Sequence, residues 1–206
     1  MIIGICGLIG SGKDTIADYL IKRHNFQKLS FADKLKDSVA TMFDWDRSLL
    51  DGKTDQSRQW REEIDEYWSN ETGEEITPRL VLQLFGTECM RNGFYDGIWV
   101  SLTKKKILDN PMQNFVIPDV RFPNEVTAIK NQGGQIVWVQ RGRLPEWYNS
   151  AVEANNGSNL HINEMKINKI HASEWAWVGT EFDHVIENDT SIDDLYTTVK
   201  KLIVSS

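Results

Sequence analysis

The first fifteen residues, MIIGICGLIGSGKDT, constrain the fold of this chain more than any other stretch. A short apolar run, typical of a buried parallel strand, ends at Gly7 and leads into a glycine-rich turn that closes with Gly12 and Lys13. Four residues separate Gly7 from Gly12, and a helical pattern follows. This spacing, in a strand–loop–helix context, predicts a phosphate-binding loop.

The residue types of this loop suit a triphosphate. Backbone N–H groups of a glycine-rich turn supply many donors, and the N-terminus of the following helix adds positive potential. Lys13 adds a mobile point charge for the β- and γ-phosphates. The predicted phosphate cradle consists of Gly10, Ser11, Gly12, Lys13, Asp14 and Thr15.

Asp14 departs from the usual motif. A Ser or Thr whose hydroxyl holds Mg²⁺ normally follows the lysine, whereas here Asp14 follows and Thr15 comes one place later. Phosphates would repel Asp14 unless a metal ion or another cation lies between. The sequence leaves two alternatives open: Asp14 reaches Mg²⁺, directly or through water, or Thr15 takes this role.

The bulk composition is that of an ordinary globular domain. The chain has 206 residues, 40% of them hydrophobic and 26% charged, which predicts one domain over 1–206 with room for a small inserted subdomain. The net charge of −7 argues against a nucleic-acid partner. With only Cys6 and Cys89, and with no signal peptide or membrane-length apolar run, a reducing cytoplasmic compartment is expected.

Strand and helix patterns alternate along the chain. This alternation predicts an α/β fold in three layers, with a mostly parallel five-stranded sheet and helices on both faces. Helices are expected over 13–24, 31–43, 58–68, 77–91, 123–132 and 191–203, and another follows Asp96 and carries Trp99, Leu102, Ile107 and Leu108. The five expected strands cover 1–6, 26–31, 114–118, 135–140 and 182–187. The irregular stretch over about 142–178 is interpreted as a lid-like insertion.

The stretch VIPDVRFPNE carries the second chemical signal. An apolar strand that ends in Asp119, after a phosphate loop earlier in the chain, is typical of a carboxylate that holds Mg²⁺. Arg121 lies two residues on and could reach a transferring phosphoryl group. The residue after Asp119 is Val120, whereas ATPase motors place a glutamate there to polarise water, so transfer to a substrate is favoured over hydrolysis.

Further arginines follow strand ends, where ligands bind in parallel sheets. Arg141, with Arg143 as a weaker candidate, opens the irregular stretch as lid arginines would, although ordinary surface arginines are the alternative. On the helix expected over 77–91, Gln83, Thr87 and Arg91 share one face at spacings of four. Such a face could bind a base and a phosphate. By its pattern alone, however, an ordinary solvent-exposed face is the better interpretation.

Five segments in order, GLIGSGKDT, SFADKLK, LQLFGTECMR, DVRFPNE and HASEWAW, resemble the deoxynucleoside monophosphate kinases of tailed bacteriophages. The resemblance runs from Gly7 to about Asp189, and GKDT in place of GKST is a usual form in that family. It implies a P-loop kinase fold with a mobile lid and transfer of the γ-phosphoryl group of ATP to a deoxynucleoside monophosphate (dNMP), with Mg²⁺, giving dNDP and ADP.

The resemblance also implies roles for residues. Lys13, Asp119, Arg121 and Arg141 would be catalytic, and Asp14 and Asp119 would lie at the metal. The implied dNMP-binding residues are Asp33, Lys34, Gln83, Thr87, Arg91, Arg121, His171 and Glu174.

Two other functions stay open from the sequence. One is a kinase for another small phosphorylated substrate, of the phosphomevalonate or dephospho-coenzyme A type. The other is a nucleotide-binding regulatory module without transfer activity. The expected partners are the small-molecule substrates ATP and dNMP, with no nucleic acid and no membrane, and a homodimer is left open. The expected compartment is the cytoplasm, that of the host if the chain is phage-encoded.

Overall fold

The computed structural model describes residues 1–204 and divides into two compact units. The sheet unit comprises residues 1–30 together with the chain from Thr103 onward, and the helical unit comprises Phe31–Leu102. The boundary between them falls within helix α7 (Ile98–Leu108). Of the range 1–206 that the sequence assigns to one domain, residues 205 and 206 lie outside the described part.

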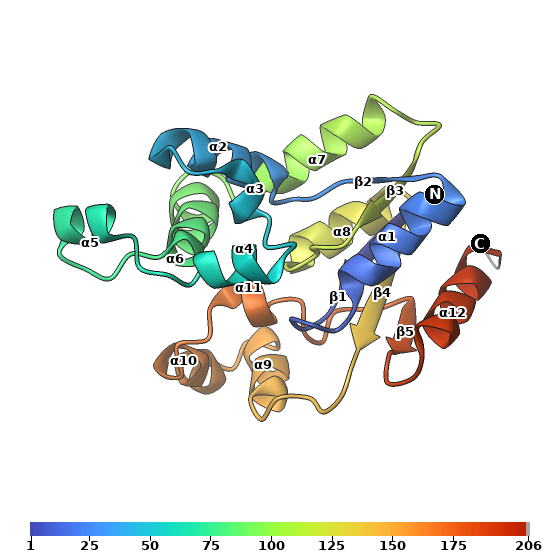
Figure 1. Cartoon of the computed structure of the whole chain (residues 1–206). Coiled ribbons are helices and arrows are strands. Elements are labelled where there is room, and N and C mark those ends of the chain that lie inside the picture. Colours follow the sequence, from blue (N-terminus) through green and yellow to red (C-terminus); the bar gives the residue numbers. More distant parts are fainter. Residues whose placement is uncertain (205–206) are drawn as a thin grey trace. The chain divides into compact units, whose positions relative to one another are not determined.

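The sheet unit contains five parallel strands in the order β2-β3-β1-β4-β5, which confirms the predicted fold class (Figure 1). The strands are β1 (Ile2–Cys6), β2 (Phe26–Lys28), β3 (Asn114–Ile117), β4 (Gln135–Gln140) and β5 (His184–Glu187). The first strand is central, and all five of its residues are buried. The phosphate loop therefore begins in the middle of the carboxyl edge of the sheet.

Side chains of β1 alternate between the two faces of the sheet. Ile3 and Ile5 pack with α1 (Lys13–His24) and α12 (Ile192–Val204) in one hydrophobic cluster. Gly4 faces α8 (Pro123–Asn131), where a Cβ atom would come within 2.6 Å of the Ile129 Cδ1 atom. The predicted helices on both faces are confirmed, and glycine at position 4 allows α8 to approach closely.

Three short helices occupy the stretch that the sequence leaves irregular, namely α9 (Tyr148–Asn155), α10 (Asn159–Ile167) and α11 (Ala172–Trp175). The Asn155 amide donates to the Val178 carbonyl at 2.6 Å and to two neighbouring carbonyls at 3.3 Å. Met165 and Trp177 are almost fully buried. Trp177 packs against Trp138 of β4 and against Phe182, so this stretch is joined to the rest of the sheet unit, while its motion as a lid stays a prediction.

The helical unit is built from short helices around a separate core. Aromatic side chains, among them Phe43, Trp45, Trp60 and Trp68, pack against buried aliphatic residues such as Val39 and Leu50. Its helices are α2 (Asp33–Phe43), α3 (Arg47–Leu50), α4 (Asp55–Trp60), α5 (Glu66–Thr72), α6 (Pro78–Gln83) and the π-helix η1 (Leu84–Asn92), followed by the start of α7.

Two helix predictions in this unit are wrong in part. A single helix over 58–68 does not form, because α4 ends at Trp60 and the Asp65 carboxylate starts a new helix by accepting from the Trp68 N–H. The helix expected over 77–91 starts with the predicted Thr77 cap but becomes a π-helix from Leu84, whose side chain is exposed rather than buried.

The π-helix coincides with a side-chain bond to its backbone. The Trp99 indole N–H donates to the Gly86 carbonyl at 2.9 Å. Gly86 also packs closely against Leu35, whose Cδ2 atom lies 2.8 Å from where a Cβ atom would be. A side chain that bonds into a helical ladder favours such a distortion, and no local spacing reveals it.

Candidate active site

The phosphate loop has the shape that its glycines predict. Gly12 has φ 103°, and a Cβ atom there would lie 2.4 Å from the Asn188 amide nitrogen. That amide donates to the Ser11 carbonyl at 2.8 Å. At Gly7 (φ 150°) a Cβ atom would lie 2.4 Å from the Val139 carbonyl oxygen. Both glycines are therefore required by positive φ and by close neighbours.

Lys13 begins α1 and turns back over the loop. Its ammonium donates to the Gly7 carbonyl at 2.8 Å and to the Leu8 carbonyl at 2.6 Å. Burial, followed by the positive charge of Arg121, lowers the pKa of Lys13 to about 8. The nearby carboxylates of Asp14 and Asp119 act in the opposite direction. Asp119 and Arg121 therefore both act on the charge of Lys13, and a shared catalytic role of the three residues stays a prediction.

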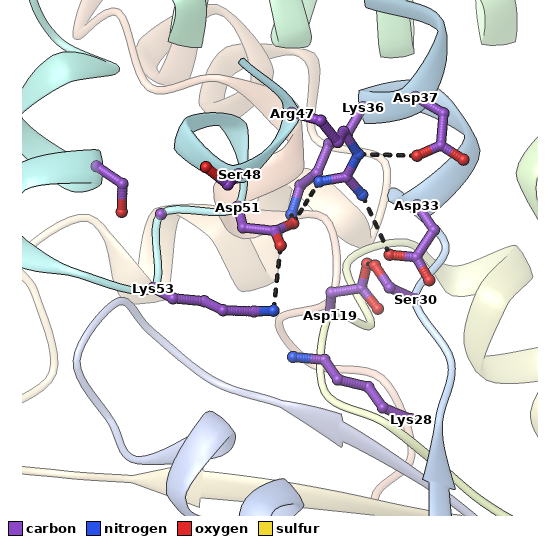
Figure 2. Close-up of polar contacts among 12 residues, drawn as sticks. Lys28, Ser30, Asp33, Lys36, Asp37, Arg47, Ser48, Asp51, Lys53 and Asp119 are labelled. Atoms are coloured by element: carbon purple, nitrogen blue, oxygen red, sulfur yellow. Dashed lines mark hydrogen bonds and ion pairs between the residues drawn. The ribbon is translucent and has the colours of Figure 1, made fainter. Parts of the chain in front are cut away.

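Asp119 follows β3 and is positioned by hydrogen bonds on either side of it. The Ser30 hydroxyl, two residues beyond β2, donates to the Asp119 carboxylate at 2.5 Å (Figure 2). The next residue, Val120, is buried, and its N–H donates to the Ile5 carbonyl at 3.3 Å. The carboxylate is thus fixed beside the strand that carries the phosphate loop.

Arg121 is held through its own backbone. Its N–H donates to the Glu125 carboxylate at 2.7 Å, and the Phe122 N–H donates to the same oxygen at 3.2 Å. Glu125 is 2% exposed. The Arg121 guanidinium donates to the Ser173 carbonyl at 3.2 Å. The stretches DVRFPNE and HASEWAW, which are 52 positions apart at this bond, are therefore neighbours within the sheet unit.

His171 and Glu174, the candidates in the segment HASEWAW, both form hydrogen bonds within the protein. The His171 Nδ1 atom accepts from the Ser173 N–H at 3.2 Å and so caps α11. The Glu174 backbone carbonyl accepts from the Trp177 indole at 2.9 Å. These contacts place both residues beside the segment that Arg121 reaches, and their predicted role in binding dNMP stays a prediction.

Arg141 and Arg143 follow β4 at the carboxyl edge of the sheet, and both are exposed. Between them, Gly142 has φ 65°, and its N–H donates to the Asp189 carboxylate at 2.7 Å. The turn that carries the two arginines is thereby fixed to the residues after β5. Their side chains are on the surface, as the lid interpretation and the ordinary-surface alternative both require.

Asp14 makes an ion pair that the sequence did not suggest. Its carboxylate lies 3.2 Å from the Lys28 ammonium, at the end of β2. The Asp14 side chain is 80% exposed and that of Lys28 is 34% exposed. Thr15, the other residue considered for the metal, is partly buried in the first turn of α1.

Candidates in the helical unit include Asp33 and Lys34, at the start of α2. Arg47 lies 3.7 Å from Asp33 and donates to Asp37 at 2.8 Å and to Asp51 at 2.6 Å (Figure 2). Lys34 is exposed and lies 3.3 Å from Asp37. The Arg47 hydrogen bond is the main cause that holds the pKa of Asp37 below its usual range. Asp33 is therefore part of an ionic network that joins α2 to α3.

Gln83, Thr87 and Arg91 differ in exposure. Gln83 and Thr87 are half-buried, whereas the Arg91 side chain is only 3% exposed. The Arg91 guanidinium donates to the Asp96 carbonyl at 3.1 Å and to its carboxylate at 3.4 Å. A plain solvated face, the interpretation that the spacing favours, is wrong for Arg91, because the π-helix turns this arginine inward.

No group of three or more potential metal-ligating His, Cys, Asp or Glu side chains occurs within residues 1–204. A structural metal cage is not what this site resembles. Mg²⁺ in phosphotransferases is held by one or two carboxylates, with phosphate oxygens and water completing its shell. The donor set of Asp119, with the Ser30 hydroxyl beside it, fits that kind of magnesium site.

Four residues that contact the candidate site were not predicted from the sequence: Lys28, Ser30, Glu125 and Asn188. Lys28 and Ser30 lie in the predicted strand FQKLSF, where alternation gives both the same face. That signal, combined with the ligand edge of the sheet, could have found them. Asn188 follows the last strand with no local feature that marks it.

Comparison with known proteins assigns the family. The sequence model of the deoxynucleotide monophosphate kinases matches residues 48–199, more than half of the chain. The chain belongs to this family. It is a phosphotransferase that phosphorylates deoxynucleoside monophosphates, and a kinase of this family implies ATP as the phosphate donor.

Two viral relatives agree with the assignment. A protein of Acanthamoeba polyphaga mimivirus named "Putative deoxynucleotide monophosphate kinase" is 29% identical over 211 residues, which cover 97% of this chain and 94% of the relative. The "Deoxynucleoside-5'-monophosphate kinase" of Escherichia phage T5 is 44% identical over 50 residues, 24% of this chain and 20% of that one.

Among solved structures, that of TT1252 from Thermus thermophilus is 17% identical to this chain, with a TM-score of 0.49. The match covers 100% of this chain and 97% of the other.

Within residues 1–204, no helix combines the length and the apolar character that a membrane span requires.

Proposed function

We propose that the sheet unit binds ATP at the phosphate loop and transfers its γ-phosphoryl group with Lys13, Asp119 and Arg121. The observation that carries this proposal is the common electrostatic site of these three residues, in which Arg121 and Asp119 each shift the pKa of Lys13. They lie in the segments that follow two adjacent strands, β1 and β3. Arg141, after β4, is the proposed fourth catalytic residue.

The proposed transfer is direct. A phosphate oxygen of the dNMP attacks the γ-phosphorus of ATP, a new oxygen–phosphorus bond forms, and the bond to the bridging oxygen of ADP breaks. The dNMP phosphate is already ionised and needs no strong general base. Lys13 and Arg121 neutralise the charge that spreads over the transferring group and hold it in line.

Magnesium is part of this proposal. Asp119, oriented by Ser30, would hold Mg²⁺ directly or through water. When bound, the ion would neutralise the β- and γ-phosphate oxygens. Asp14 lies on the first turn of α1, and its own contact is with Lys28.

Each unit carries residues proposed to bind dNMP. In the sheet unit these are Arg121, His171 and Glu174. Those in the helical unit are Asp33, Lys34, Gln83, Thr87 and Arg91. The support for them is their place in the five segments that resemble the family, and for Asp33 and Arg91 also the ionic contacts that hold their side chains.

A panel of the four dNMPs and the matching ribonucleotides, each with ATP and Mg²⁺, tests the proposal. Formation of dNDP and ADP in equal amounts is expected with at least one dNMP, and chelation of Mg²⁺ should abolish it. A reaction without acceptor controls for hydrolysis. Turnover only with phosphomevalonate or dephospho-coenzyme A, or tight ATP binding without any transfer, would contradict the proposal.

A further inference from the structure

The acidic residue in the phosphate loop has a specific partner. Asp14, directly after Lys13, lies 3.2 Å from the ammonium of Lys28, the last residue of β2. Strand β3 separates β2 from β1 in the sheet, so the lysine side chain reaches across the end of a neighbouring strand. Figure 2 shows Lys28 and Ser30 leaving the same stretch of chain, with Asp119 beside Ser30.

This ion pair contributes little to the stability of the fold. The Asp14 side chain is 80% exposed and the Lys28 side chain is 34% exposed. Exposed pairs of this kind are worth on the order of 0.2–1 kcal/mol, because water screens them and ordering two long side chains costs entropy. A structural role therefore gives a weak reason for a lysine at this position.

The charge of the loop gives a stronger reason. A bound triphosphate brings several negative charges to the N-terminus of α1, where Asp14 would repel it. Lys28 offsets the charge of Asp14, and its strand β2 pairs with β3, the strand that Asp119 follows. The metal ion that Asp119 is proposed to hold would bind the β- and γ-phosphates, which are the phosphates involved in transfer.

We propose that Lys28 is a phosphate-contacting residue of the donor site and that Asp14 is its positioning residue. This inference rests on the proposed function, since it concerns the same triphosphate. Asp14 holds the lysine ammonium at the loop before the nucleotide binds, and Lys28 then contacts the γ-phosphate oxygens together with Lys13. Asp14 thereby acts through a protein cation and is not a ligand of the metal.

The test compares two lysine–aspartate pairs that both involve α1. Lys28→Met and Asp14→Asn disrupt the proposed pair. Lys22→Met disrupts the control pair Lys22–Asp18, which lies 3.9 Å apart, with side chains that are 74% and 61% exposed. Calorimetry measures the affinity for ATP and for ADP without acceptor, and steady-state kinetics measures kcat and the Mg²⁺ concentration for half-maximal rate.

Lys28→Met should weaken the binding of ATP about tenfold more than the binding of ADP. It should also lower kcat roughly 100-fold, as expected for the loss of one hydrogen-bond donor to the transferring group. Lys28→Arg should restore part of both. Asp14→Asn should change the same quantities by up to about fivefold. The double variant should be no worse than Lys28→Met, because the aspartate acts through the lysine. Lys22→Met should change nothing.

Three results would overturn the proposal. One is a Lys28→Met variant that behaves like Lys22→Met in nucleotide affinity. Another is equal loss of ATP and ADP affinity, which would mean that Lys28 does not contact the γ-phosphate. The third is an Asp14→Asn variant that raises the Mg²⁺ requirement while Lys28→Met does not, which would make Asp14 a metal residue.

The binding measurements keep this proposal separate from the proposed function. If the wild-type protein forms no dNDP from any dNMP, the proposed function fails, but the ATP-over-ADP preference of Lys28→Met still decides the role of Lys28. If dNDP forms and this preference is unchanged, only the inference about Lys28 fails.

Discussion

In the sheet unit the proposed donor site is made largely of backbone, whereas in the helical unit the acceptor candidates Asp33, Lys34 and Arg91 are held in ion pairs. Gly7 and Gly12 shape the phosphate loop through their φ angles, and Lys13 bonds to carbonyls of the same loop. Arg91 instead pairs with Asp96. A site made from consecutive residues can be recognised in a sequence, while one made from paired side chains depends on the packing around them.

The two units should also respond differently to mutation. Removal of a donor-site cation should affect chemistry with little effect on stability, because the loop is fixed by the backbone. Removal of an arginine of the helical unit should affect stability as well, because its partners are charged groups of the same unit.

The largest effect is expected for Lys13→Ala. It should lower kcat on the order of 1000-fold, because the variant lacks the ammonium that neutralises the charge on the transferring phosphoryl group. The affinity for dNMP should change little. Formation of dNDP and direct binding of dNMP measure the two quantities. Lys22→Ala, on the exposed side of the same helix, is the control, and turnover near the wild-type rate in Lys13→Ala would refute the donor site.

Arg91→Met should produce a combined effect. The free energy of unfolding is expected to fall by about 2 kcal/mol, since the variant loses hydrogen bonds from a charged group. The KM for dNMP should also rise about tenfold, as for the loss of one charge-assisted contact to a phosphate. Denaturant unfolding and steady-state kinetics measure these changes.

Asp96→Asn is the matched variant for Arg91, because it removes the ion pair but keeps the arginine and the Asp96 carbonyl that accepts from it. It should lower stability less than Arg91→Met and leave the KM for dNMP unchanged. A loss of stability in Arg91→Met with unaltered kinetics would show that this arginine serves the fold alone.

The pH dependence of ATP binding tests the role of Lys13 in the proposed donor site. Burial and Arg121 lower the pKa of Lys13 to about 8, so below pH 8 the free protein already carries the ammonium. Bound phosphates favour the charged form and raise this pKa. ATP affinity should therefore be constant below pH 8 and fall above it, by about tenfold per pH unit, with uptake of a proton on binding.

Calorimetry in buffers with different ionisation enthalpies measures that proton uptake. Lys13→Arg is the control, because a guanidinium keeps its charge throughout this range. The assignment of the titration to Lys13 is contradicted if the arginine variant shows the same loss of ATP affinity above pH 8.

The smallest effect is expected for Arg47→Met in the helical unit. The network of Arg47 with Asp37 and Asp51 is partly exposed, so its loss should cost about 1 kcal/mol of stability at neutral pH. The Arg47 hydrogen bond lowers the pKa of Asp37. A carboxylate whose pKa is depressed by folding stabilises above its unfolded pKa, near 4, and loses that contribution as the pH falls.

The difference in stability between wild type and Arg47→Met should therefore shrink below pH 4, as followed by denaturant unfolding at several pH values. Arg58→Met, which removes an exposed pair with Asp55, should cost less. A constant difference down to pH 2 would mean that Arg47 stabilises by packing and not by charge.

The sequence determined the phosphate loop and the parallel sheet of this protein because their signals are local. A strand, a glycine-rich turn and a lysine within fifteen residues specify a phosphate loop, and strand–helix alternation specifies a parallel sheet whose carboxyl edge gathers Lys13, Asp119 and Arg121. The dimensions of the peptide backbone enforce these relations, so no knowledge of distant contacts is needed.

Tertiary structure alone decided the rest. The π-helix over Leu84–Asn92, the burial of Arg91 and the pairing of Asp14 with Lys28 each depend on side chains that meet across different elements or turns. The spacing of residues along a helix cannot reveal a tryptophan that bonds to its backbone. Asp14 shows the limit most clearly: its sequence position demands a cation, and only the fold supplies Lys28.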